Sequence, residues 1–552
     1  MQRFLGHWLS FALFVAVAHG NAGARLDRDE TVFKGQSLEV CIKALESRQP
    51  QARVQAAKAL GRMGFKARSA VSALIERFKD EDDMVCQAAA EALGRVASVA
   101  DLVRVLGNKD ARVRRWGALA IGDVRLALGG VHPADITVGL ARDKLRNDLK
   151  AAVPALVESL RDQNDAVRVE VVLALGAIGP PAREAVPRIT VLLKDPNKLV
   201  RHTAASALWW IDGQAKIAVP ILIEGLEDRK ADLIDRQTCV YVLGEIGDKA
   251  ELAVPALIVL LRGIQKSTRT ETSVELSFRA TEAFGRIGEP AVPALITQLR
   301  DKDPDIRKNA AWALRKMGPR AQAAVPALCE MSKDNNADLR RFAVAALGKI
   351  GPAASGAVPA LIERLQDPDG VIRRYASWSL GCIGRPAKDA VPALIAMLKD
   401  KEKEARESAT WALGKIGLDA KAAVPALIKT AKKDRDHGLA AEALGRIGAD
   451  ARAAVPTLVE LLDQSSAEAR IRIALAHWRI TGHEETAVKV LTAALTDEQS
   501  AVRCYAADAL GEMGPKARAA VPALIALMKR TTSDDRSQDR EAARQALRKI
   551  GL

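Results

Sequence analysis

Residues 357–384 read AVPALIERLQDPDGVIRRYASWSLGCIG, and this pattern recurs from about residue 38 to the end of the chain. Its most visible mark is a Val-Pro step, and successive copies lie mostly 33 residues apart. The step occurs at Val153, Val186, Val219, Val254, Val292, Val325, Val358, Val391, Val424, Val455 and Val521. A degenerate copy at Val488 has Lys489 in place of proline, and looser copies start at Ser37 and Val71. Counting all copies gives about 15 units, and a fixed period of this length indicates a solenoid.

Each unit is predicted to form two helices. Proline directly after valine suits the first turn of a helix, where its missing N–H costs nothing. The apolar residues that follow recur at helical spacing, and a short Asp-Pro-Asp or Lys-Asp turn ends this first helix. A second, alanine-rich helix ends at Leu-Gly-x-Ile-Gly, where the last glycine serves as the C-cap. No unit can bury its apolar face alone, so neighbouring units must stack.

The repeats resemble the HEAT-like repeats of the bilin-lyase (PBS lyase) type, and the resemblance covers nearly the whole chain after residue 38. It implies an all-α fold, an α-solenoid of HEAT-like or armadillo type. In it about 15 helical hairpins stack into a right-handed superhelix, and the second helices line its concave face. It implies less about activity, because such repeats serve many functions.

An arginine stands seven residues before the leucine of Leu-Gly in 12 of the 15 units. Six residues before this arginine there is usually an aspartate, for example Asp367 before Arg373. Because the two residues follow the repeat, we interpret them as a structural ladder of charge-assisted hydrogen bonds that ties each turn to its neighbour. The ladder arginines include Arg168, Arg201, Arg307, Arg340, Arg373, Arg406 and Arg503.

Counting from the ladder arginine, positions plus-two, plus-five and plus-nine form one stripe on the second helix, facing away from the core. The stripe carries aromatic rings and cations most densely in the eighth to eleventh units. Rings supply contact area at low entropy cost, and lysine supplies charge, so the stripe is a candidate binding surface. The alternative is that the rings fill gaps between adjacent second helices and the lysines complement the helix dipole. The stripe comprises Trp312, Lys316, Phe342, Lys349, Tyr375, Trp378, Trp411 and Lys415.

The chain is predicted to consist of a signal peptide at residues 1–24, repeats at 38–124, an insertion at 125–148 and further repeats at 149–552, continuous with the first block. A positive residue precedes the ten-residue apolar run 9–18, and small residues follow it, which is typical of an export signal. The run is too short to span a bilayer. We therefore expect an exported protein, periplasmic or secreted, with no transmembrane segment after cleavage. Two shorter polar insertions occur near residues 263–274 and 531–539.

The sequence indicates no catalytic site. The HEAT-like deoxyhypusine hydroxylases bind iron through several His-Glu pairs, whereas this chain has one, His483-Glu484. It contains no Gly-rich phosphate loop, no zinc-ligand spacing and no nucleophile elbow. The six cysteines lie in different units and are predicted to be separate, packed thiols. We expect no cofactor and no metal.

Function is therefore predicted to be binding. The first hypothesis is a monomeric scaffold that holds a protein partner on its concave face. The second is a basic groove for a polyanion, either nucleic acid or an acidic envelope polymer, because the formal net charge is +15. The third is an enzyme related to bilin lyases or deoxyhypusine hydroxylases.

Overall fold

A computed structural model describes residues 37–124, 149–228, 231, 233–266, 271–433, 437–529 and 538–551. The described residues form helices and turns and no strand. The chain divides into two compact units, Met1–Ile287 and Gly288–Leu552. This boundary falls inside the block 149–552 that the sequence treats as continuous. The predicted signal peptide and the insertion at 125–148 lie outside the described residues.

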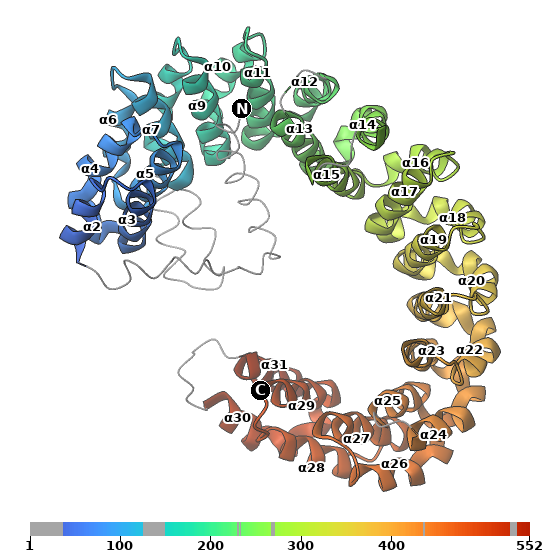
Figure 1. The fold of residues 1–552 in the computed structure, drawn as a ribbon. Coiled ribbons are helices and arrows are strands. Elements are labelled where there is room, and N and C mark those ends of the chain that lie inside the picture. Colours follow the sequence, from blue (N-terminus) through green and yellow to red (C-terminus); the bar gives the residue numbers. More distant parts are fainter. Residues whose placement is uncertain are drawn as a thin grey trace. The chain divides into compact units, whose positions relative to one another are not determined.

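Unit 1 is built from helical hairpins that follow one another along the chain (Figure 1). Its first helices are α2 (Leu38–Ala44), α4 (Val71–Glu76), α6 (Val99–Leu106), the helix at residues 149–159, α10 (Val186–Leu192), α12 (Ala215–Glu227) and α14 (Val254–Lys266). Its second helices are α3 (Pro50–Met63), α5 (Asp83–Val96), α7 (Ala111–Val124), α9 (Asp165–Ile178), α11 (Lys198–Asp212), α13 (Leu233–Ile246) and α15 (Glu271–Ile287).

Unit 2 continues the same pattern (Figure 1). Its first helices are α16 (Val292–Gln298), α18 (Val325–Met331), α20 (Val358–Arg364), α22 (Val391–Met397), α24 (Val424–Lys433), α26 (Val455–Leu462), α28 (Glu485–Ala494) and α30 (Val521–Lys529). Its second helices are α17 (Pro304–Met317), α19 (Ala337–Ile350), α21 (Gly370–Ile383), α23 (Lys403–Ile416), α25 (His437–Ile447), α27 (Ala467–Thr481), α29 (Ser500–Met513) and α31 (Gln538–Ile550). The described residues contain seven hairpins in unit 1 and eight in unit 2, which confirms the predicted solenoid of about 15 hairpins.

Short 3₁₀ helices join most hairpins to the next one, and the sequence did not predict them. In unit 1 they are η2 (Gly64–Ala70), η5 (Pro180–Ala185) and η6 (Gly247–Ala253), and η3 (Arg77–Lys79) follows α4. In unit 2 they are η7 (Glu289–Ala291), η8 (Gly318–Ala324), η9 (Gly351–Ala357), η10 (Arg385–Ala390), η11 (Gly417–Ala423), η12 (Gly448–Ala454) and η13 (Gly514–Ala520). Apart from η3, each carries the chain from the end of a second helix to the valine that opens the next first helix.

The hairpin of α20 and α21 shows why this sequence folds as it does. Pro359 lies in the first turn of α20, where its missing donor leaves no hydrogen bond unmade. The Asp369 side chain caps α21 by accepting a hydrogen bond from the Val371 N–H. Gly384 ends α21 with φ 75°, and its N–H donates to the Leu380 carbonyl. The predicted proline start and glycine stop are therefore the signals that the structure uses, and the Asp369 cap adds a start signal that was not predicted.

Packing between repeats runs through the second helices. Successive second helices such as α19, α21 and α23 pack along one another, and each also packs on the first helix of its own hairpin. Buried alanines and leucines, among them Ala376 and Leu380 of α21, fill this contact. Small side chains let the helices approach closely, which produces two layers with a thin core between them.

Residues Ala337–Arg364 are long and apolar enough to meet a length-and-composition test for a membrane span. They are not one uninterrupted helix, because α19, η9 and α20 succeed one another here. Gly351 breaks the run with φ 70°. The same three kinds of element join the neighbouring repeats, so the segment is repeat core in the protein.

Candidate functional site

The eight stripe residues lie on four successive second helices of unit 2. Helix α17 carries Trp312 and Lys316, α19 carries Phe342 and Lys349, α21 carries Tyr375 and Trp378, and α23 carries Trp411 and Lys415. All five rings are half-buried, and the three lysines are exposed. The structure thus brings these residues onto consecutive helices that pack side by side.

The rings pack between repeats and also keep part of their surface in solvent. The Trp378 ring lies against Gly348 of the preceding second helix, and the Trp411 ring lies against Gly381 in the same way. Trp312 and Phe342, also on neighbouring helices, have ring centroids 5.8 Å apart. The two interpretations that the sequence left open are therefore compatible: each ring is part packing and part surface.

Cations lie over several of these rings. The Lys349 ammonium of α19 is 5.5 Å from the Trp378 ring centroid of the next repeat, and the Lys415 ammonium is 5.3 Å from the Trp411 centroid. Arg374 lies 5.0 Å over Tyr375. These distances are within the range of cation–π attraction. The result is a surface of partly exposed rings with positive charges lying over them.

The ladder arginines bridge consecutive turns. Arg340 donates from Nε and Nη2 to the Asp367 carboxylate of the next repeat, at 2.9 and 3.0 Å. Its Nη1 donates to the carbonyls of Asp334 and Asn335 in its own turn. A single guanidinium therefore ties two loops together with four hydrogen bonds. Bidentate pairing of this kind is strong and directional.

Two of the other ladder arginines repeat this scheme, and the rest vary it. Both Arg168 and Arg373 pair bidentately with the aspartate 27 residues later, Asp195 and Asp400. Arg307 pairs with Asp334 at 3.3 Å, Arg201 with Glu224 at 3.2 Å, and Arg503 with Asp539 at 2.6 Å. Arg406 donates to the carbonyls of Asp400 and Lys401.

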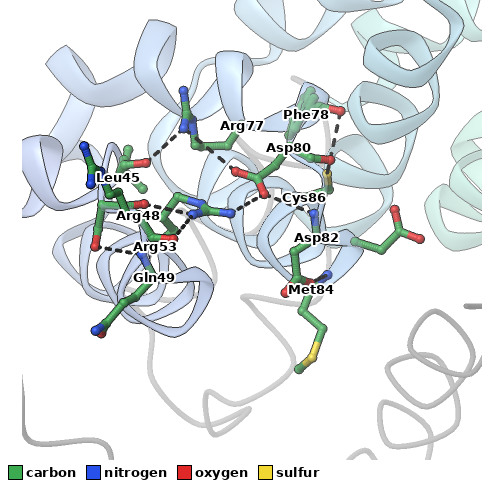
Figure 2. A network of polar contacts seen from close by, with 12 residues as sticks. Leu45, Arg48, Gln49, Arg53, Arg77, Phe78, Asp80, Asp82, Met84 and Cys86 are labelled. Atoms are coloured by element: carbon green, nitrogen blue, oxygen red, sulfur yellow. Dashed lines mark hydrogen bonds and ion pairs between the residues drawn. The ribbon is translucent and has the colours of Figure 1, made fainter.

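The first rung shows the network in detail (Figure 2). Asp80 accepts from the Arg53 guanidinium at 2.7 Å and from the Asp82 N–H at 3.1 Å. Arg77 reaches back to the Leu45 carbonyl at 3.1 Å. Arg53 and Asp80 thus bind each other and also bind the backbone of the loops beside them, which is a structural role.

One group of chemistry-bearing residues was not predicted. In unit 1 the ligand atoms of His202 in α11 and of Asp235 and Cys239 in α13 lie within 4.8 Å of one another, and all three residues are buried. His202 Nδ1 is 2.7 Å from Asp235 Oδ2. Burial first, and the Asp235 carboxylate second, raise the pKa of the Cys239 thiol well above its usual value. His483 and Glu484, which form the single His-Glu pair, are both exposed.

All six cysteines are free thiols in the structure: Cys41, Cys86 and Cys239 are buried, and Cys329, Cys382 and Cys504 are half-buried.

Comparison with known proteins agrees with the geometry. A model of HEAT repeats matches residues 38–122, 153–237, 262–348, 358–445 and 455–548, and a model of the PBS lyase HEAT-like repeat matches residues 339–367 and 438–464. Among curated proteins, none matches this chain by sequence.

Solved structures of karyopherins share the fold. The crystal structure of Kap121p has a TM-score of 0.57 and 13% identity, covering 98% of this chain and 68% of that chain. Kap121p bound to Nup53p has a TM-score of 0.56 and 14% identity, covering 100% of this chain and 67% of that chain. Kap121p bound to the extreme C-terminus of the protein phosphatase Cdc14p has a TM-score of 0.56 and 13% identity, covering 93% of this chain and 65% of that chain. Identities this low concern the fold alone.

Proposed function

The chain belongs to the HEAT-repeat proteins, and we propose that it is a scaffold that binds a protein partner through the stripe of unit 2. The observation that carries the proposal is the placement of five half-buried rings and three exposed lysines on consecutive second helices. Rings held between repeats are already ordered, so binding them costs little side-chain entropy. Solvent-facing ring surface beside cations is the composition found at binding hot spots.

The proposed partner is a peptide segment or a protein surface with apolar and acidic side chains. Apolar groups would cover the ring faces, and carboxylates would meet Lys316, Lys349 and Lys415. The solved structures of Kap121p bound to Nup53p and to the extreme C-terminus of Cdc14p lend the proposal support by analogy of fold.

The test uses the double variant Trp378→Ala with Trp411→Ala. It is compared with the control Leu418→Ala with Val459→Ala, which removes two exposed apolar side chains of unit 2 from outside the stripe. Partners captured by the unaltered chain at high salt are expected to be lost from the first variant and kept by the control. Circular dichroism must show the same helix content in all three proteins. Equal capture by both variants would exclude the stripe as the binding surface.

The same experiment separates the polyanion alternative. Contacts to a polyanion weaken steeply as salt rises, because bound counterions are released on association. If capture disappears at high salt and does not depend on Trp378 and Trp411, the partner is a polyanion, either nucleic acid or an acidic polymer, and not a protein.

We also propose that the protein is exported, acts as a monomer and has no enzymatic activity of its own. The apolar run at residues 9–18, with a positive charge before it and small residues after it, supports export. Mass spectrometry of the protein from an export-competent host should find a new N-terminus near residue 24. Retention of Met1 would contradict the proposed cleavage.

A further inference from the structure

His202, Asp235 and Cys239 meet at the contact between two consecutive repeats of unit 1. Helix α11 supplies His202, and successive turns of one face of α13 supply Asp235 and Cys239, four residues apart. The exposed fractions of the three residues are 2%, 7% and 0%. An imidazole, a carboxylate and a thiol thus share one closed space between the helices.

Most other repeats do not carry an aspartate and a cysteine at the positions of Asp235 and Cys239. The position of Asp235, one residue before the ladder arginine, holds a buried aliphatic residue in most repeats, such as Val167, Val200 and Val502. The position of Cys239 holds a buried alanine at Ala310, Ala343 and Ala376. Two independent positions therefore depart from the repeat at the same point, and both departures introduce a metal-binding atom.

Helix α12, the first helix of the hairpin that contains Asp235 and Cys239, also differs from the other repeats. Gly225 of α12 stands six residues after the Val-Pro valine, where other repeats have larger residues such as Met331 and Met397. A Cβ at Gly225 would lie 2.7 Å from the Cys239 sulfur and 2.8 Å from His202 Cε1. Only glycine lets α12 cover the cluster this closely, so the absence of a side chain here is part of how the cluster is enclosed.

The polar atoms of the cluster are not all satisfied by protein. His202 Nε2 and Asp235 Oδ1 are buried and have no hydrogen-bond partner among the residues that the structure describes. Leaving a buried polar atom without a partner is unfavourable, so such atoms call for an explanation. The hydrogen bond between His202 Nδ1 and Asp235 Oδ2 satisfies one polar atom of each side chain. His202 Nε2 and Asp235 Oδ1 are left for a further ligand.

The charge of the set matches a divalent cation. With Cys239 as thiolate, Asp235 as carboxylate and His202 neutral, the three ligands carry two negative charges. A divalent ion makes the group neutral, and a neutral group is far cheaper to bury than isolated ions. Nitrogen, sulfur and carboxylate oxygen together are the ligand types of zinc, which three protein residues can hold with a fourth small ligand.

We propose that His202, Asp235 and Cys239 form a site for a zinc-class divalent metal that pins α11 to α13. Binding releases the thiol proton to water, and the imidazole binds in its neutral form. Complete burial of Cys239 excludes the competing assignment of a Cys-His-Asp catalytic triad, because no substrate reaches the sulfur.

The test uses Co²⁺ as the probe on the full chain, purified with a chelator and kept reduced. A titration is expected to show one equivalent of cobalt with a thiolate-to-cobalt charge-transfer band in the near ultraviolet. Zinc should displace the cobalt, abolish the band and raise the melting temperature. Absence of the band, together with an unchanged melting temperature in zinc, would overturn the proposal.

The substituted residues are ones that other repeats carry at the same positions, so that the variants keep the fold. Cys239→Ala and Asp235→Val install the residues that equivalent positions carry, and both are expected to lose the band and the zinc-dependent shift in melting temperature. Cys86→Ala removes a buried thiol outside the cluster and should keep both. A band that persists in Cys239→Ala, or that disappears in Cys86→Ala, would assign the metal to other thiols and exclude this site.

Discussion

The indole ring of Trp378 in α21 covers Gly348 in α19, so closely that a Cβ at residue 348 would lie 2.5 Å from Trp378 Cζ3 and 2.4 Å from Ser379 Oγ. The same relationship recurs one repeat later, where a Cβ at Gly381 would lie 2.5 Å from Trp411 Cζ3. The glycine of the Leu-Gly step therefore does two things in these repeats. It lets the second helices approach, and it provides the flat backbone surface on which the next repeat places its ring.

Replacing Gly348 by alanine is expected to destabilise unit 2 by about 1–3 kcal/mol, because the added methyl group forces the ring and Ser379 to move. The free energy of unfolding is measured in urea by circular dichroism. In the double variant with Trp378→Ala the cost should be smaller than the sum of the two single costs, since the clash with the ring is removed and only the one with Ser379 remains. Gly356→Ala is the matched control, because a Cβ there meets nothing within 4 Å. A Gly348→Ala protein as stable as the control would contradict the contact.

The variant Arg340→Lys tests the ladder, and Arg341→Lys beside it serves as the control. Lysine keeps the charge but cannot span the Asp367 carboxylate and the carbonyls of Asp334 and Asn335 together. Arg340→Lys is expected to cost about 2 kcal/mol, because buried acceptors lose their donor. Arg341 forms an exposed pair with Asp338, and its replacement should change stability by less than about 0.5 kcal/mol. Equal losses from the two variants would mean that the ladder is no more than surface charge.

Much of the fold could be predicted because its signals are local and repeated. Pro359, Asp369 and Gly384 act within one or two turns of their own position, so a single repeat shows where its helices begin and end. The ladder was also visible in the sequence, because Arg340 and Asp367 recur at a fixed spacing. The 3₁₀ helices were not predicted, because a segment such as Gly351–Ala357 contains small residues that suit a turn as well as a helix.

The candidate sites depended on contacts that no local pattern reveals. Whether Trp378 is half-buried is decided by Gly348, thirty residues earlier on another helix. His202 and Asp235 are 33 residues apart, which is one repeat and not a metal-binding spacing. A comparison of each repeat position along the chain could have found them, because Asp235 and Cys239 stand where most repeats have an aliphatic residue and an alanine.

The thiol of Cys86 is expected to resist alkylation in the native protein. Burial, opposed by the Arg112 guanidinium, raises the pKa of Cys86 to about 11, and its sulfur lies 3.5 Å from the Asp80 carbonyl. At pH 8 only about a thousandth of the thiol would be the reactive thiolate. Iodoacetamide at pH 8, followed by peptide mass spectrometry, should leave Cys86 unmodified in buffer and modify it in urea. Modification at equal rates in the two conditions would show that the first repeats open readily.

The variant Asp400→Asn is expected to lower stability at neutral pH and to change the response to acid. The Arg373 guanidinium donates to both oxygens of Asp400, and these hydrogen bonds first, with burial opposing them, lower the pKa of the carboxyl below its usual value of 3.8. A carboxylate with a lowered folded-state pKa contributes stability above that usual value, and the contribution is lost as pH falls through the folded-state pKa. At pH 7 the amide leaves the buried Arg373 charge without its carboxylate partner, with the Asp367 and Pro368 carbonyls still accepting from Nη1, and this loss is expected to cost about 3 kcal/mol. The difference in free energy of unfolding between wild type and variant should therefore narrow as pH is lowered from 5 toward 3, measured by urea unfolding at each pH.

Asp389→Asn, which removes an exposed carboxylate of the same unit, controls for the loss of one surface charge. A difference that stays constant from pH 7 to pH 3 would mean that the pair contributes through packing and not through the charge on Asp400.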